Sequence, residues 1–332
     1  MGLYIILAIF LTFVLTVAFA PLVLPFLRKL KFGQSILEIG PSWHKTKQGT
    51  PTVGGIIFII PILVITLILG AKSVFSNDLK TLFTLIFIFL CGVVGFIDDY
   101  TKITKKHNQG LTVRQKTILL LAVIALYLGA MYLTGNITTD IFVPFINKRL
   151  HLSYFYFLLI LPFIFFFVNS VNLTDGLDGL VTSVTIPYTL AFILAALMFN
   201  IAGKGNIGVA VLAASAFGGL FGFLIYNFHP AKVFMGDTGS LFLGALVVGL
   251  AMCYDMPYFI LLGGIVYLIE GLSVVMQVGY FKLTHGKRIF KMTPIHHHFE
   301  MCKWTEVKIV IIFTIVSLIA SAAALYGIFY SL

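Results

Sequence analysis

The chain has 332 residues, of which 60% are hydrophobic and only 10% are charged, and its mean hydropathy is +1.05. These values exclude a soluble globular protein of this length and are typical of an integral membrane protein with several spans. The formal net charge of +10 suits anionic lipid headgroups and phosphorylated substrates, and no nucleic-acid-binding module accompanies it. Cys91, Cys253 and Cys302 have neither metal-ligand spacing nor the pattern of a disulfide framework.

Ten apolar runs approach or exceed the roughly 20 residues that a transmembrane helix needs. They lie near residues 3–27, 53–71, 81–97, 117–134, 153–171, 180–199, 207–226, 239–253, 258–281 and 307–330. The ninth run contains Gly263, Gly264 and Glu270, and we expect that helix to be bent or broken. No linker interrupts the chain. The sequence therefore predicts an all-α polytopic membrane protein with one domain over residues 1–332.

The basic residues predict how these spans are oriented. The first run has no basic residue before it and is followed by Arg28, Lys29 and Lys31, the reverse of the charge order in a removable signal peptide. Most of the 22 Lys and Arg residues fall in the loops that follow odd-numbered spans. The positive-inside rule then places those loops in the cytoplasm and both termini outside. In the longest outside loop, residues 135–152, β-branched residues around a turn predict a small periplasmic hairpin.

Aspartates interrupt the apolar sequence in three short breaks, all on the predicted cytoplasmic side. Asp98 and Asp99 follow the third run, Asp175 and Asp178 precede the sixth, and Asp237 precedes the eighth. An aspartate at the centre of a bilayer costs roughly 2.5–3.5 kcal/mol on insertion scales, so carboxylates gathered at span ends indicate a functional site. The pattern favours a membrane enzyme.

Adjacent carboxylates at the C-terminal end of a helix are unfavourably placed, because the helix dipole is negative there. For Asp98 and Asp99, the simplest compensating charges are a Mg²⁺ ion and the nearby Lys102. Mg²⁺ is usually held by one or two carboxylates together with substrate phosphate oxygens. A solvated helix end is the alternative for this pair taken alone.

The other two breaks combine aspartates with glycines. In residues 172–179 we expect Asp175 and Asp178 to share one face of the following helix, where one of them can cap its N-terminus. Capping leaves Asn172 and the two glycines unexplained, and glycines allow a ligand to approach the backbone closely. In residues 234–240, amides at the start of the eighth span can bind an anion while Asp237 holds a cation.

A fourth break carries His296, His297 and His298. Three consecutive histidines cannot all face one metal from a helix or a strand, so a plain zinc site is excluded. They can instead donate to phosphate or sugar oxygens, and a solvated turn is the alternative. Basic residues on the same side suit a diphosphate, and among them we favour Lys45 and Lys102; the others are Lys47, Lys105, Lys106, Arg114 and Lys116.

The order of these breaks resembles the phospho-N-acetylmuramoyl-pentapeptide transferase (translocase I) family, within the superfamily of polyprenyl-phosphate N-acetylhexosamine-1-phosphate transferases. The resemblance runs from about Trp43 to the last span and is carried by residues 50–55, Asp98-Asp99 with Lys102, and residues 172–179, 227–240 and 294–300. The aspartate motifs are shared across the superfamily. The His-His-His-Phe-Glu run points to the muramoyl-pentapeptide branch.

The resemblance implies transfer of phospho-MurNAc-pentapeptide from UDP-MurNAc-pentapeptide to undecaprenyl phosphate, which forms lipid I and UMP in peptidoglycan synthesis. It also implies a homodimer among membrane lipids of the bacterial inner membrane, an active site on the cytoplasmic face, and no nucleic-acid partner. One alternative is a UDP-GlcNAc:polyprenyl-phosphate GlcNAc-1-phosphate transferase. Another is a secondary transporter with Glu270 as an ion relay, although transporter sites normally lie near the bilayer midplane.

By the same resemblance, Asp237 is the principal Mg²⁺ ligand with Asp98 close by. Asp98 is also the implied base that deprotonates the lipid phosphate, and Asp99 supports the site. Direct attack and an aspartyl intermediate both fit this arrangement. The implied uridine pocket consists of Asp175, Gly176, Leu177, Asp178 and Phe234, with Phe234 stacking on uracil. The remaining implied nucleotide and sugar contacts are Lys45, Thr50, Asn172, Asn227, Gln277, His296, His297 and His298.

Overall fold

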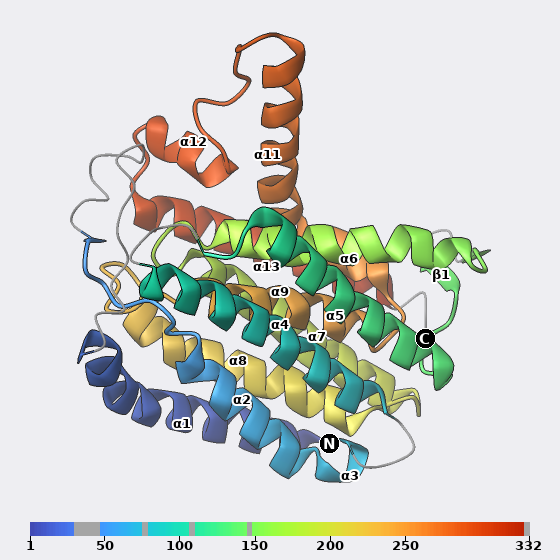
Figure 1. The fold of residues 1–332 in the computed structure, drawn as a ribbon. Helices are drawn as coiled ribbons and strands as arrows, with labels where there is room; N and C mark the ends of the chain where they lie inside the picture. The colour runs from blue at the N-terminus through green and yellow to red at the C-terminus, as the bar shows by residue number, and fades with distance from the viewer. Residues whose placement is uncertain (30–46, 75–78, 106–109, 145–147, 329–332) are drawn as a thin grey trace.

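The computed structural model of the protein describes residues 1–29, 47–74, 79–105, 110–144 and 148–328. Most of its helices run side by side in one bundle, and α11 projects away from them (Figure 1). The elements in chain order are α1 (Gly2–Lys29), α2 (Ile56–Leu69), α3 (Ala71–Val74), α4 (Lys80–Thr104), α5 (Val113–Leu133), β1 (Asp140–Val143), β2 (Lys148–His151), α6 (Phe155–Thr174), α7 (Leu180–Ile201), α8 (Ile207–Asn227), α9 (Gly236–Met252), α10 (Pro257–Gly263), α11 (Ile265–Leu283), α12 (Ile295–Met301) and α13 (Glu306–Ile328).

The predicted all-α polytopic fold is confirmed. Within the described residues, eight helices are long and apolar enough to cross a membrane: α1, α4, α5, α6, α7, α8, α11 and α13. Two further predicted spans are shorter, because α2 has 14 residues and α9 has 17. Helix length therefore does not establish the expected count of ten. Every residue of α9 from Thr238 onward is buried, so this short helix is enclosed by its neighbours.

The ninth predicted span is broken, as its glycines indicated. Helix α10 ends at Gly263 and α11 begins at Ile265. A side chain at Gly264 would collide with the carbonyl oxygen of Ile260, 2.3 Å from the position of its Cβ atom. The outer part of α11 carries exposed apolar residues, among them Val275 and Leu283. In a bilayer such residues face lipid, so the projecting helix suits a membrane environment.

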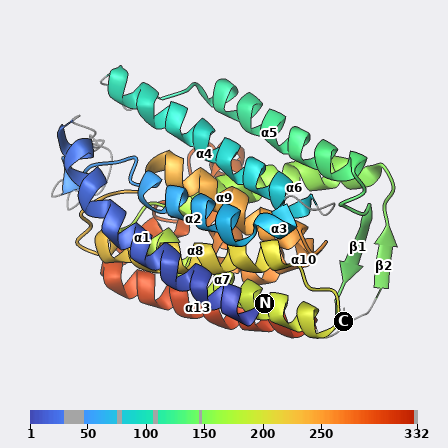
Figure 2. The same cartoon turned by 90° about the horizontal axis from the view of Figure 1, so that it is seen from below.

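Helix α9 lies at the centre of the bundle and packs against α4 and α6 (Figures 1 and 2). The close approach of α4 and α9 depends on Gly95. A Cβ atom there would lie 2.1 Å from the carbonyl oxygen of Asp237, which leaves room for hydrogen alone. Because Gly95 precedes Asp98 by less than one helical turn, the same contact brings the first aspartate pair to the third aspartate.

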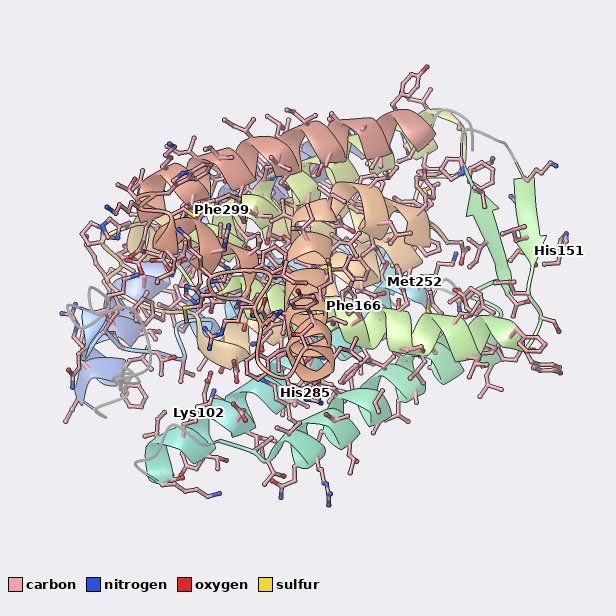
Figure 3. The ribbon with its side chains drawn as sticks, turned by 90° about the horizontal axis from the view of Figure 1, so that it is seen from above. Lys102, His151, Phe166, Met252, His285 and Phe299 are labelled. Atoms are coloured by element: carbon pink, nitrogen blue, oxygen red, sulfur yellow. The ribbon has the colours of Figure 1, made fainter. Side chains whose placement is uncertain are left out.

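The expected hairpin is present, and it shares one end of the bundle with the N-terminus and the end of α13 (Figures 1 and 2). Strands β1 and β2 pair antiparallel with Asp140 opposite His151. Lys102 of α4 and Phe299 of α12 lie at the end opposite to His151 (Figure 3). All three aspartate breaks and the histidine segment therefore occupy the same end of the bundle.

This arrangement makes the orientation testable by thiol labelling. In a variant without Cys91, Cys253 and Cys302, we expect Asn136→Cys to react with an impermeant maleimide in intact cells. Lys287→Cys should react only after permeabilisation, because the positive-inside rule places its loop in the cytoplasm. Reaction of Lys287→Cys in intact cells would contradict a cytoplasmic site.

Candidate active site

Asp98, Asp99 and Asp237 form a compact cluster at one end of the bundle, and one ligand oxygen of each lies within 4.8 Å of the others. Asp98 and Asp99 are each 3% exposed. Helix α4 continues to Thr104, so this pair lies inside the helix and not at its C-terminal end as expected. Asp237 lies in the first turn of α9. Helices α4 and α9 start far apart in the sequence, and their carboxylates thus meet in one cluster.

Two lysines supply positive charge to this cluster. The Nζ atom of Lys102 lies 2.6 Å from Asp98 Oδ2, 2.8 Å from Asp237 Oδ2 and 3.7 Å from Asp99 Oδ1. Lys116 Nζ lies 3.0 Å from Asp237 Oδ2. A capping box formed by Thr112 and Gln115 starts α5 and so sets the position of Lys116. Buried carboxylates require such partners, because unpaired charges are strongly destabilising away from water.

The two neighbouring aspartates have different surroundings. Asp99 accepts hydrogen bonds from the amides of Asp237 and Thr238 and from the Thr238 hydroxyl, at 3.2, 2.9 and 2.7 Å. It therefore caps the N-terminus of α9, where the helix dipole favours a negative charge. Asp98 Oδ1 accepts from the Leu111 amide at 2.8 Å, and Oδ2 faces Lys102. Asp99 is the more tightly held of the pair.

Asn172, at the end of α6, connects the cluster to the second aspartate break. Its Nδ2 donates to Asp237 Oδ1 at 2.8 Å and to Ser240 Oγ at 2.7 Å. Its Oδ1 accepts from Lys116 at 3.4 Å. Both ends of this amide are used, so Asn172 orients the Asp237 carboxylate and Lys116 with respect to each other.

The alternative that Asp175 or Asp178 caps the next helix does not apply. Helix α7 begins at Leu180, after Gly179 with φ +75°, and in the described part of the chain no side chain caps it. The left-handed turn at Gly179 directs Asp178 away from the helix start. Asp178 instead accepts from Lys47 Nζ at 2.7 Å and from the Ala231 amide at 3.0 Å.

Asp178 belongs to a second polar cluster, in which Lys47 also contacts Glu306 Oε2 at 2.6 Å and His229 Nδ1 lies 3.1 Å from Asp178 Oδ2. Asp178, His229 and Glu306 could by distance hold a metal, but Lys47 bridges the two carboxylates. The cluster opens into a cavity of about 660 Å³. Its lining residues are Lys47, Thr50, Asp178, His229, Pro230, Ala231, Glu300, Lys303, Trp304, Thr305, Glu306 and Val307.

Asp175 lies between α6 and α7, beside both clusters. Burial raises its pKa well above the usual range, and the charges of Asp237, Asp99 and Asp178 raise it further. Its protonated form is therefore favoured and can donate a hydrogen bond. Leu177 is only 4% exposed and packs in the core.

The segment that carries Phe234 is fixed by backbone pairing. The Phe234 amide donates to the Pro51 carbonyl at 2.8 Å, and the Gly54 amide donates to the Phe234 carbonyl at 2.9 Å. Asn227 is 2% exposed, accepts from Thr182 Oγ1 and donates to the Val233 carbonyl. Asn227 thus supports this segment from within, while the Phe234 side chain remains half-buried.

The histidines lie on the short helix α12, and each has a different partner. His296 is fully buried, with Nδ1 3.0 Å from Glu270 Oε2. His297 Nδ1 lies 2.6 Å from Glu300 Oε2. His298 Nδ1 accepts from the Lys291 amide at 3.1 Å. The three side chains therefore point in different directions, so a single ligand would not contact all three in the same way.

Gln277 and Lys45 complete the predicted set. Gln277 Oε1 accepts from the amides of Ile289 and Phe290 at 3.1 and 2.9 Å, which fixes the return from α11 to α12. Lys45 lies outside the described residues. Thr50 lines the cavity.

Sequence reasoning did not single out Lys116, Lys47, His229 or Glu306. Lys116 and Lys47 were noted only as members of the basic set, and Glu306 merely opens the last span. Their partners are distant: Lys116 is separated from Asp237 by 121 residues, and Lys47 from Glu306 by 259. No local spacing can indicate such pairs. A carboxylate near a span end was the one available signal for Glu306.

Comparison with known proteins gives one consistent result. Residues 81–255 match the family model described as Glycosyl transferase family 4. A phospho-N-acetylmuramoyl-pentapeptide-transferase of Clostridium botulinum (strain Alaska E43 / Type E3) is 47% identical over 315 residues, covering 94% of this chain and 93% of the relative. The protein of the same name from Clostridium perfringens (strain 13 / Type A) is 44% identical, covering 95% of this chain and 96% of the relative. The one from Listeria monocytogenes serotype 4b (strain F2365) is 42% identical, covering 97% of this chain and 97% of the relative. With its aspartate and histidine segments gathered at one end of a membrane bundle, this chain belongs to the phospho-N-acetylmuramoyl-pentapeptide transferase family.

Proposed function

We propose that this protein transfers phospho-MurNAc-pentapeptide from UDP-MurNAc-pentapeptide to undecaprenyl phosphate and releases UMP. The observation that carries the proposal is the cluster of Asp98, Asp99 and Asp237 with two lysines at one end of a membrane bundle. Such a cluster can bind phosphate groups that arrive from both water and lipid. The names of the relatives support the identity of the two substrates.

Mg²⁺ is the proposed cofactor, held by Asp237 and Asp98. The residues fit this ion, because carboxylate oxygens are hard ligands and Mg²⁺ completes its shell with phosphate oxygens and water. Lys102 Nζ contacts oxygens of both aspartates, which supports a site for positive charge at this position. When bound, Mg²⁺ would neutralise developing charge on the diphosphate. Because Lys102 and the ion share these oxygens, the binding of one is coupled to that of the other.

The side chains of the cluster have separate proposed roles in the reaction. Asp98 is the proposed base for the lipid phosphate, since Asp99 is engaged in capping α9. Lys102 and Lys116 would stabilise the negative charge on the transferred phosphoryl group. Asn172 holds Asp237 in place.

The cavity of about 660 Å³ is the proposed site for the nucleotide and sugar. It lies between Thr50 and Asp178, with Phe234 held close by the pairing of its backbone to Pro51. Asp175, protonated as its surroundings favour, could donate to a carbonyl oxygen of uracil. His297 and His298 are partly exposed and suit sugar oxygens, whereas His296 is buried.

The membrane context completes the proposal. The exposed apolar side chains of α11 suit contact with membrane lipids and with a prenyl chain. The basic loops support an active site on the cytoplasmic face of the bacterial inner membrane. A homodimer is part of the same proposal. A transporter is disfavoured, because Lys102, which contacts Asp98 and Asp237, lies at the end of the bundle opposite to His151 and not near its middle (Figure 3).

The test is release of UMP by purified protein with undecaprenyl phosphate and each nucleotide sugar in turn. We expect turnover with UDP-MurNAc-pentapeptide, loss of turnover with EDTA and recovery with Mg²⁺. Turnover with UDP-GlcNAc in its place would assign the chain to the GlcNAc-1-phosphate branch. Absence of UMP release with both substrates would contradict the proposal.

The three carboxylates should be the most sensitive positions. Asp98→Asn, Asp99→Asn and Asp237→Asn should each lower kcat by at least about 10²-fold, the scale of an acid–base or metal contribution. Asp140→Asn, in the hairpin at the opposite end, is the matched control and should retain activity. Near-normal turnover of the Asp237 variant would remove this residue from the site.

Nucleotide binding should depend on stacking as well as on charge. Phe234→Ala should weaken binding of the UDP-sugar by about 1–3 kcal/mol, the range for an aromatic ring stacked on a base. The KM for undecaprenyl phosphate should stay nearly constant. Phe221→Ala, which removes an exposed ring from α8, is the control. An equal loss for both substrates would show that the segment had collapsed.

A further inference from the structure

Glu270 and His296 form a fully buried pair that the proposed chemistry leaves unexplained. Glu270 lies in α11 and His296 in α12, and both side chains are 0% exposed. The Nδ1 atom of the histidine lies 3.0 Å from Glu270 Oε2. Ionisable side chains inside a membrane bundle are expensive and usually serve a function. The burial of His296 argues against direct contact with the substrate.

The pair is poorly suited to stabilising the fold. Glu270 Oε1 and His296 Nε2 are buried, and neither has a hydrogen-bond partner among the described residues. Unpartnered buried polar atoms lower stability. Replacing a buried polar pair with apolar side chains of similar volume is often neutral or stabilising. A role other than stability is therefore required.

The free Nε2 atom is aimed at the second aspartate break. A Cβ atom built on Gly176 would lie 2.2 Å from His296 Nε2 and 2.8 Å from its Cε1. Only a glycine at position 176 allows this contact. When Nδ1 carries the proton and donates to Glu270, the neutral ring carries its lone pair on Nε2. The other tautomer would direct an N–H at the backbone of Gly176.

Glu270 is itself held against α6. The adjacent Gly271 packs so tightly that a Cβ atom would lie 2.1 Å from Ser170 Oγ and 2.8 Å from Cζ of Phe166. Phe166 lies beside α11 in Figure 3. Ser170 precedes Asn172 by two residues, so the carboxylate of Glu270 is fixed close to where α6 enters the aspartate break.

We propose that Glu270 is a positioning residue for the nucleotide site. It holds His296 as the Nδ1–H tautomer, and the opposite edge of that ring sets the position of Gly176. The position of Gly176 in turn sets the position of the backbone from Asp175 to Asp178. The inference rests on the proposed function, in which residues 175–178 line the nucleotide pocket. It assigns Glu270 a role that acts through His296 and not through an ion pathway.

The kinetic test compares Glu270→Gln with Glu270→Met. Glutamine keeps an oxygen that accepts from Nδ1, whereas methionine has similar volume and no such acceptor. Glu270→Gln should remain within about 2-fold of the wild type. Glu270→Met should raise the KM for UDP-MurNAc-pentapeptide by about 5-fold or more, the scale of one lost hydrogen bond. Its KM for undecaprenyl phosphate should change little, although its melting temperature should fall, because the buried Nδ1–H of His296 loses its acceptor.

A spectroscopic test needs no substrate and so is independent of the proposed function. In ¹⁵N spectra of histidine-labelled protein, the His296 signals are identified by their loss in His296→Gln. We expect a protonated Nδ1 and an unprotonated Nε2 in the wild type and in Glu270→Gln, and a changed pattern in Glu270→Met. Asp140→Met, which disrupts the histidine–carboxylate pair of Asp140 and His151 in the hairpin, is the matched control and should leave the His296 signals unchanged.

The outcomes separate the two claims. An unchanged His296 pattern in Glu270→Met would overturn the positioning role. So would equal losses for both substrates, which would indicate a structural role alone. A changed pattern with an unchanged KM for the nucleotide sugar would overturn the assignment of residues 175–178 to the nucleotide pocket while leaving the tautomer assignment in place.

Discussion

Asp98, Asp99 and Asp237 bring three carboxylates within 4.8 Å of one another, and the rest of the site depends on how their repulsion is offset. Lys102 contacts all three, and the amides at the start of α9 bind Asp99. Each partner compensates a charge that the bundle excludes from bulk water. In our proposal, a Mg²⁺ ion and the phosphates of the substrate take over part of this compensation.

Close helix contact makes this charge cluster possible. Gly95 lets α4 approach the carbonyl of Asp237, and a larger residue would separate the first aspartate pair from the third. The pairing of Phe234 with Pro51 and Gly54 then fixes the backbone of the proposed stacking residue against the neighbour of Thr50, which lines the cavity. The proposed catalytic and nucleotide regions are thus joined through α9 and the segment before it.

Whereas Gly95 brings two helices together, the break between α10 and α11 lets one helix leave the bundle. Helix α11 begins in the core, where Glu270 meets His296, and ends among exposed apolar residues (Figure 1). In our proposal the same helix therefore contacts lipid at its outer end and positions the nucleotide segment at its inner end. This link offers a physical route by which the two substrates could influence each other.

The sequence by itself determined the membrane class, the broken ninth span, the hairpin and the family, because hydropathy, glycine placement and motif order are local properties of the chain. It also identified the aspartates that converge at one end. The partners of those aspartates were decided by tertiary structure alone. Lys116 and Asp237 are 121 residues apart, and Asp178 caps no helix because the left-handed turn at Gly179 directs it to Lys47. The burial of His296 likewise depends on its contact with Glu270, 26 residues away, which no spacing along the chain can express.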